Sequence, residues 1–122
     1  MSAPNRSRWI APGLWAVLIE TLTSWPRLPS VGPQGSDKLG HLAMFAVFAF
    51  LVARALEPGR PSLRTVAIVA AAMAAWAALD EVHQMFIPGR SGEFADWVAD
   101  VAGAGLGLLA RRWINASQLN VT

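Results

Sequence analysis

Residues 37–54 read DKLGHLAMFAVFAFLVAR, an apolar run with charged residues at either end. Between Lys38 and Arg54 the one ionisable side chain is that of His41. The run is rich in alanine and leucine and does not alternate between polar and apolar residues, so it predicts a helix rather than a strand. A membrane-spanning helix needs about 20 mostly apolar residues. This run reaches that length when its polar first turn is counted.

The sequence contains three similar apolar runs, one before and two after this one, and proline- and glycine-containing turns separate them. In a bilayer the backbone must satisfy its own hydrogen bonds, which favours helices for runs of this kind. We therefore predict an all-α fold, an integral membrane bundle of four transmembrane helices. The other three runs cover residues 9–25, residues 65–79 and residues 94–110.

The composition of the chain supports lipid as the solvent for much of its surface. It is 54% hydrophobic and only 15% charged, whereas soluble domains carry about 25% charged residues. The absence of cysteine excludes disulfides and thiolate metal sites. Lysines and arginines form no continuous basic stripe, so we expect no nucleic-acid partner. We expect one domain over residues 1–122, with a motif-bearing core at 37–109 and a polar tail at 113–122.

The basic residues are distributed unevenly across the predicted bundle. No small-x-small cleavage site closes the first run, so we expect an uncleaved first helix. The positive-inside rule then predicts that both termini are cytoplasmic. On this layout every acidic residue except Glu57 lies toward the outer face, together with both histidines. The cytoplasmic side carries Arg6, Arg8, Arg54, Arg60, Arg64, Arg111 and Arg112, against Arg27, Lys38 and Arg90 on the outer side.

The first turn of the second run carries two candidate site residues. Asp37 and His41 are four residues apart and share a helix face, so Asp37 can accept a hydrogen bond from the imidazole and raise its basicity. Asp37 alone could equally cap the helix N-terminus. His41 lies one turn deeper, where capping does not explain it and ionisable groups usually face the bundle interior or a wet cavity.

The third run ends in a second polar group. Asp80, His83 and Gln84 are spaced to share one helix face, while Glu81 is expected to point elsewhere. An ordinary amphipathic exit from the membrane would explain His83 and Gln84 equally well.

The fourth run carries a stripe of Asp96, Asp100, Gly103 and Gly107. The two glycines form a small-xxx-small pair that allows close helix approach, so we expect the stripe to face the bundle. A buried carboxylate needs a partner. Arg90, in the preceding loop, is the expected bidentate partner of Asp96.

The sequence contains possible metal ligands and serine nucleophiles, but neither forms a recognisable motif. Histidines and carboxylates are ligands for zinc or manganese, but no spacing here matches a zinc signature, and we expect no metal and no other cofactor. Ser36 and Ser91 are ordinary loop serines, so no activated nucleophile is indicated.

The motifs DKLGH at residues 37–41 and DEVHQMFIPGR at residues 80–90, followed by Asp96, Asp100 and the two glycines, resemble the VanZ-like family of small bacterial membrane proteins. The resemblance covers roughly residues 37–109. It implies a bundle of transmembrane helices in the bacterial cytoplasmic membrane. The name-giving member is an accessory factor for resistance to the glycopeptide teicoplanin. The family pattern includes Glu81, and Asp100 departs from it because the family commonly has Asn there.

Three functions follow from these patterns. We favour an envelope protein that modulates teicoplanin susceptibility or binds a phospholipid headgroup or lipid-linked cell-wall precursor through an extracytoplasmic polar cluster. The first alternative is a membrane-embedded enzyme with acid–base chemistry at His41 and Asp37, and the second is a small transporter. Candidate catalytic residues are Asp37, His41, Asp80 and Asp96; candidate substrate-binding residues are Lys38, Glu81, Gln84, Arg90 and Asp100.

Overall fold

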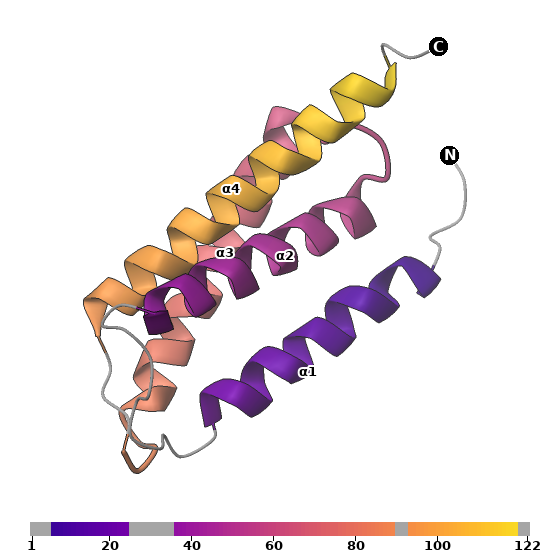
Figure 1. Cartoon of the computed structure of the whole chain (residues 1–122). Coiled ribbons are helices and arrows are strands. Elements are labelled where there is room, and N and C mark those ends of the chain that lie inside the picture. Colours follow the sequence, from indigo (N-terminus) through magenta and orange to yellow (C-terminus); the bar gives the residue numbers. More distant parts are fainter. Residues whose placement is uncertain (1–5, 25–35, 90–92, 120–122) are drawn as a thin grey trace.

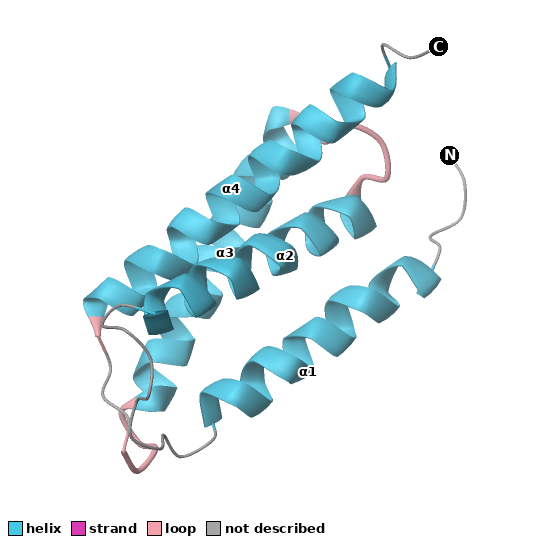
Figure 2. Cartoon of the chain, in the orientation of Figure 1, coloured by secondary structure: helices cyan, strands magenta, loops and turns pink. Residues whose placement is uncertain are grey.

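The computed structural model describes residues 6–24, 36–89 and 93–119, and within these ranges the chain contains helices and no strand (Figure 2). The predicted all-α class is therefore confirmed for the described residues. The elements are a short 3₁₀ helix η1 (Arg6–Trp9), α1 (Ile10–Ser24), α2 (Ser36–Leu56), α3 (Leu63–Gln84) and α4 (Phe94–Leu119).

Helices α2, α3 and α4 extend beyond the apolar runs from which they were predicted, whereas α1 lies within its run. The largest difference is at α4, which continues through Leu119, although the sequence predicts a polar tail from residue 113. Once a helix is nucleated, each further residue adds a hydrogen bond at little cost, so polar residues can prolong it. At the start of α3, the Ser62 hydroxyl accepts a hydrogen bond from Thr65 N (3.2 Å) and caps the helix.

The four long helices form a bundle in which α2 and α4 share the largest interface (Figure 1). Helix α3 packs against both, and α1 lies along the outer side with fewer contacts. The starts of α2 and α4 and the end of α3 lie at one end of the bundle. Polar residues in these three segments are thereby brought together.

Two of the described helices are long and apolar enough to cross a membrane: Asp37–Leu56 within α2, and Leu63–Gln84. Large apolar side chains such as those of Ile68 and Leu79 remain exposed on the bundle surface. Helix α1 has 15 residues, short of the roughly 20 that a span needs. The helical bundle and its membrane character thus agree with the sequence prediction, and four spans remain a prediction.

The core is built from medium and small side chains with aromatic residues between them. Phe48 contacts Phe45 and Trp76 edge-to-face, with ring centroids 6.1 and 5.2 Å apart. Two other tryptophans donate hydrogen bonds across helices: Trp15 Nε1 to Met44 O (2.8 Å) and Trp97 Nε1 to Ala74 O (3.0 Å). Satisfied indole N–H groups and apolar rings together fix how α1 and α4 lie on their neighbours.

A glycine seam joins α4 to α2. A Cβ atom at Gly103 would overlap the backbone of Leu42, and one at Gly107 would overlap the backbone of Ala46. The two helix backbones are in direct contact here, as small-residue packing allows. The predicted close approach at this glycine pair is confirmed. Its direct effect is to bring the first turns of α2 and α4 near each other.

Candidate functional site

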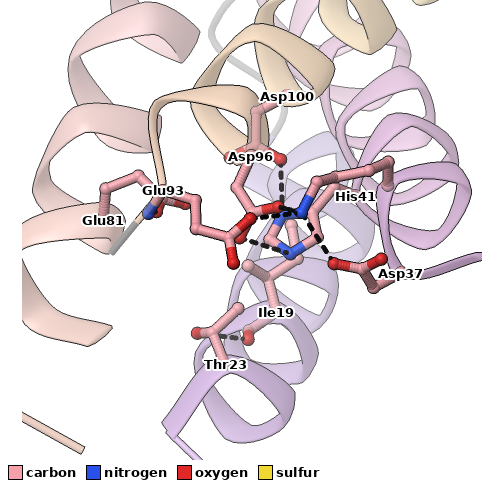
Figure 3. A network of polar contacts seen from close by, with 9 residues as sticks. Ile19, Thr23, Asp37, His41, Glu81, Glu93, Asp96 and Asp100 are labelled. Atoms are coloured by element: carbon pink, nitrogen blue, oxygen red, sulfur yellow. Dashed lines mark hydrogen bonds and ion pairs between the residues drawn. The ribbon is translucent and has the colours of Figure 1, made fainter. Parts of the chain in front are cut away.

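Seven polar side chains converge where α2 and α4 begin and α3 ends (Figure 3). We call this set the polar cluster. Helix α2 contributes three members, α3 one, and the start of α4 the rest. Its members are Asp37, Lys38, His41, Glu81, Glu93, Asp96 and Asp100.

Lys38 is the cation at the centre of one half of the cluster. Its Nζ lies 2.8 Å from Asp37 Oδ2, 2.7 Å from Glu93 Oε2 and 2.6 Å from Asp96 Oδ1. The Asp96 side chain is only 3% exposed, so this contact compensates a carboxylate that would otherwise be buried without a partner. The ammonium group has three donors, and the three carboxylates can use all of them.

His41 lies at the centre of the other half. Its Nδ1 is 2.8 Å from Asp100 Oδ1, and its Nε2 is 3.8 Å from Asp96 Oδ2. The carboxylate that orients the imidazole is therefore that of Asp100, whereas the sequence predicts Asp37 in that role. Asp37 contacts Lys38 instead. Spacing along one helix identified a plausible partner, but the nearest carboxylate comes from α4.

Glu81 joins the cluster from the end of α3. Its Oε2 accepts a hydrogen bond from Glu93 N (2.9 Å), and it groups with His41 and Asp100. Glu81 points elsewhere than Asp80, as the helix spacing predicts, and its direction leads into the cluster, in agreement with the family pattern. Met73 and Ala77, two turns and one turn earlier, are buried in the core. Glu81 continues that inward face, which is the signal that helix periodicity offered.

Asp80 and Gln84 are buried but lie apart from the contacts of His41 and Lys38. Asp80 is 4% exposed and lines a small cavity with Glu20 and Trp76, and Trp76 Nε1 donates to Glu20 Oε1 (3.1 Å). Gln84 is buried, and its Nε2 has no partner among the described residues. His83, predicted to share their face, is exposed.

Two site-related residues were missed by the sequence analysis, and one predicted residue falls outside the description. Glu93 enters the cluster because it directly precedes α4, and Glu20 partners Trp76 from within an apolar run. An isolated acidic residue in a run that is otherwise apolar was the available signal for Glu20. Arg90, predicted as a substrate-binding residue and a partner of Asp96, lies outside the described residues.

The polar cluster contains more acidic than basic groups. Five carboxyl groups, from Asp37, Glu81, Glu93, Asp96 and Asp100, face the Lys38 ammonium and the His41 imidazole. An arrangement of this kind attracts cations and hydrogen-bond donors. It also supplies an oriented imidazole–carboxylate pair, which is the usual basis of acid–base chemistry.

An apolar groove adjoins the polar cluster. It has a volume of about 370 Å³ and runs between α3 and the start of α4. Glu81 and Glu93 belong to both the groove wall and the cluster. The groove is therefore continuous with a polar site, as expected for a pocket that holds an amphipathic molecule. Its apolar wall is formed by Ala78, Val82, Met85, Phe94 and Trp97.

Comparison with known proteins agrees with this description. The VanZ/LLP1 family model matches residues 5–115. The chain belongs to this family. The match includes all four long helices up to residue 115 and every member of the polar cluster. No match was found among curated proteins or among solved structures.

Membership confirms the resemblance seen in the DKLGH and DEVHQMFIPGR motifs. Together with the two helices that are long and apolar enough to cross a bilayer, it identifies a VanZ-family membrane protein. The structure adds that some of the motif residues, from three helices, meet in the polar cluster, among them His41, Glu81 and Asp100.

Proposed function

We propose that this protein binds an envelope lipid, either a phospholipid or a lipid-linked cell-wall precursor, and thereby modulates susceptibility to glycopeptides such as teicoplanin. The lipid chain would lie in the groove between α3 and α4, and the polar head would contact the polar cluster. One observation carries the proposal: Glu81 and Glu93 line the apolar groove and also belong to the cluster. An amphipathic ligand can satisfy both surfaces at once.

The burial pattern supports this assignment. The walls of the groove are apolar and partly exposed, with Met85 and Phe94 among the most exposed large side chains. In a bilayer such a surface meets lipid chains rather than water. Within the polar cluster, by contrast, the side chains of His41, Asp96 and Asp100 are at most 13% exposed. A lipid can therefore reach the groove sideways from the membrane, without passing through the bundle.

The proposed topology places the cluster at the extracytoplasmic surface. In it all four long helices cross the bacterial inner membrane, and both termini are cytoplasmic. Support comes from the arginines at the opposite end of the bundle, where Arg54, Arg60 and Arg111 flank the α2–α3 loop or the later part of α4. A cysteine introduced at Arg60 should be shielded from a membrane-impermeant thiol reagent in intact cells. Labelling of this cysteine from outside the cell would show that the protein has the opposite orientation in the membrane.

Filling the groove tests the lipid-binding proposal directly. Ala78→Phe adds a large side chain to the groove wall, whereas Ala71→Phe adds the same group to an exposed position of α3 that is not part of the wall. We expect Ala78→Phe to reduce co-purified or photo-crosslinked lipid at least tenfold and to abolish any change in teicoplanin susceptibility on expression. Ala71→Phe should behave like the wild type. Equal lipid retention in both variants would refute the groove as the binding site.

The His41–Asp100 hydrogen bond favours one second candidate, an enzyme that acts on the bound lipid. An imidazole held by a carboxylate can serve as general base or acid. His41→Gln keeps a polar side chain of similar size but cannot exchange protons near neutral pH. If the protein is an enzyme, this variant should lose the product of the reaction more completely than it loses lipid. If it is a binding protein, lipid retention and the susceptibility phenotype should change together.

A further inference from the structure

Three members of the polar cluster, on three different helices, present ligand atoms toward one point. One ligand atom from each of His41, Glu81 and Asp100 lies within 4.8 Å of the others. The His41 Nδ1–Asp100 Oδ1 distance is 2.8 Å. Around a tetrahedral zinc ion with bonds of roughly 2.0–2.2 Å, neighbouring ligand atoms lie about 3.3–3.6 Å apart. The His41–Asp100 pair is closer than these values and every pair lies within 4.8 Å, so small side-chain rotations would bring the three atoms to the spacing of metal ligands.

Two buried oxygen atoms of this trio have no hydrogen-bond partner within the described part of the chain. They are Glu81 Oε1 and Asp100 Oδ2. Asp100 as a whole is fully buried, so water does not solvate its second oxygen from outside. Buried carboxylate oxygens are almost always paired with a donor or a cation. Both belong to carboxylates that group with the His41 imidazole, so a cation bound among the three side chains would satisfy them.

Lys38 does not supply that partner, because its contacts lie in the other half of the cluster. Its ammonium contacts Asp37, Glu93 and Asp96. Those three carboxylates also lie within 4.8 Å of one another, but the lysine already holds them together. A cation bound by His41, Glu81 and Asp100 would therefore add contacts that Lys38 does not already make. Two carboxylates and one imidazole suit a divalent ion by both charge and ligand type.

We propose that His41, Glu81 and Asp100 bind a divalent cation of the zinc or manganese class. Imidazole favours zinc among the common ions, and paired carboxylates also suit manganese. Three protein ligands leave a coordination position for water or for a ligand oxygen, as in catalytic rather than structural zinc sites. The sequence did not indicate this site, since its ligands lie 40 and 19 residues apart along the chain.

Asp96 completes the surroundings of the proposed site. With the cation on Nδ1, the other ring nitrogen of His41 faces Asp96 Oδ2 at 3.8 Å. Metal-bound histidines generally donate their second N–H to a carboxylate, which fixes the tautomer and the ring orientation. Asp96 is in turn held by Lys38 at 2.6 Å. Lys38 thus supports the site through Asp96 and is a positioning residue.

A bound cation would also determine which class of lipid the protein binds. This inference rests on the proposed lipid-binding function. The acidic cluster alone would repel a phosphate group. A divalent ion with an open position, beside Lys38 and next to the apolar groove, would attract the phosphate of a phospholipid or of a lipid-linked precursor. The lipid phosphate would then form a bridge between the cation and the lipid chains that occupy the groove.

Cation binding can be measured without any lipid assay. The full chain, purified in detergent and stripped with a chelator, is titrated with Zn²⁺ and with Mn²⁺ by isothermal titration calorimetry, and metal content is measured by mass spectrometry. We expect one ion per chain. Asp100→Asn, Glu81→Gln and His41→Ala should each weaken binding at least a hundredfold, and Asp96→Asn should weaken it about ten- to a hundredfold.

The controls match the ligands in residue type. His83→Ala removes an exposed histidine two residues from Glu81, and Glu57→Gln neutralises an acid at the opposite end of the bundle. Both should bind metal like the wild type. Circular dichroism checks that every variant is folded. Because three ligands are substituted separately, the test remains valid if one of the variants misfolds. No binding by the wild type at millimolar concentration, or unchanged binding in folded ligand variants, would overturn the proposal.

The lipid proposal and the metal proposal fail in different ways. The binding of phospholipid, supplied from vesicles, to the purified protein is measured in the presence of Zn²⁺ or Mn²⁺ and again in the presence of a chelator. Stoichiometric metal binding without lipid retention upholds the site and refutes the proposed function. Lipid retention that is equal in chelator refutes the phosphate bridge. Lipid retention that rises at least tenfold with the metal, and is lost in Asp100→Asn, supports both.

Discussion

Helices α2 and α4 contact each other through polar side chains in one half of their interface and through their backbones in the other half. In the half nearer the start of both helices, Lys38 and His41 face Asp96 and Asp100 through short polar contacts. In the adjoining half, Gly103 and Gly107 contact the α2 backbone without any intervening side chain. The difference shows a division of roles. The glycine seam sets the distance between helices, and the charged half uses that distance to bring ionisable groups into hydrogen-bonding range.

The largest effect is expected from breaking the seam. Gly107→Ala places a Cβ atom against the backbone of Ala46, which cannot move aside as a side chain can. We expect a loss of about 3 kcal/mol in the free energy of unfolding, at the upper end of typical overpacking costs. Denaturation in mixed detergent micelles, followed by circular dichroism, measures it.

Gly105→Ala is the matched control for the seam. Gly105 lies on the same helix, and an added Cβ would meet nothing within 4 Å. Alanine has the higher helix propensity, by about 1 kcal/mol, so this variant should equal or exceed the wild type in stability. If Gly107→Ala and Gly105→Ala are equally stable, the seam does not set the helix separation.

The charged half is tested by Lys38→Met. The substitution leaves the buried Asp96 carboxylate without its cation. Because the Lys38 side chain is 30% exposed, we expect a loss of about 2 kcal/mol, below the roughly 3–5 kcal/mol of a fully buried pair. Arg64→Met, which removes an exposed cation, should stay near the wild type.

A double-mutant cycle sharpens the same point. Adding Asp96→Asn to Lys38→Met removes the uncompensated charge, so the double variant should be at least about 1 kcal/mol more stable than the sum of the single effects predicts. Strict additivity would mean that the 2.6 Å contact contributes nothing to folding.

A smaller effect is expected at the far end of α4. Arg111 Nη2 donates to Pro58 O (3.0 Å) and Gly59 O (3.3 Å), which ties α4 to the α2–α3 loop. Arg111→Met keeps the aliphatic stem but removes these donors, and it should cost about 1 kcal/mol of unfolding free energy. Metal binding at the distant polar cluster should not change. A loss of metal binding in this variant would show that the two ends are coupled.

The smallest effect concerns Glu57, the acid at the end opposite the cluster. Ser62 N (2.8 Å) and the Thr65 hydroxyl (2.7 Å) donate to its carboxylate and hold the pKa of Glu57 below its usual range. A lowered pKa in the folded state stabilises the fold above the unfolded-state pKa of about 4.3. That stability is lost as the pH falls through the folded-state pKa. The wild type should therefore exceed Glu57→Gln in stability at pH 7 and match it in strong acid.

Much of the fold could be predicted from local sequence. The mostly apolar runs predicted the helices, because the backbone of a long run in lipid has few alternatives. The spacing of Gly103 and Gly107 gave the helix approach, because small residues four apart form a flat strip. Helix ends were predicted less well: α4 continues past Ala110, since polar residues can prolong a helix that apolar packing has already anchored.

Some members of the polar cluster could be predicted from the sequence, but the hydrogen-bond partner of His41 could not. The positions of His41, Asp96 and Asp100 followed from depth and periodicity. The partner of His41 did not, since Asp37 on the same helix and Asp100 on another were equally compatible with the spacing. Periodicity within α3 directs Glu81 inward, but its contact with Glu93 depends on the register between α3 and α4, which no pattern within either helix encodes.

By itself, the sequence determined that this chain is helical, that it is suited to a membrane, and that its acidic residues gather near one end. These properties depend on composition and on periodicity, which are local. The tertiary structure decided that Lys38 contacts one group of carboxylates. It also decided that His41, Glu81 and Asp100 form another group, in which two buried oxygens have no partner among the described residues. That separation depends on how the backbones of α2 and α4 meet at two glycines, and contacts between distant segments exist only once the helices have packed.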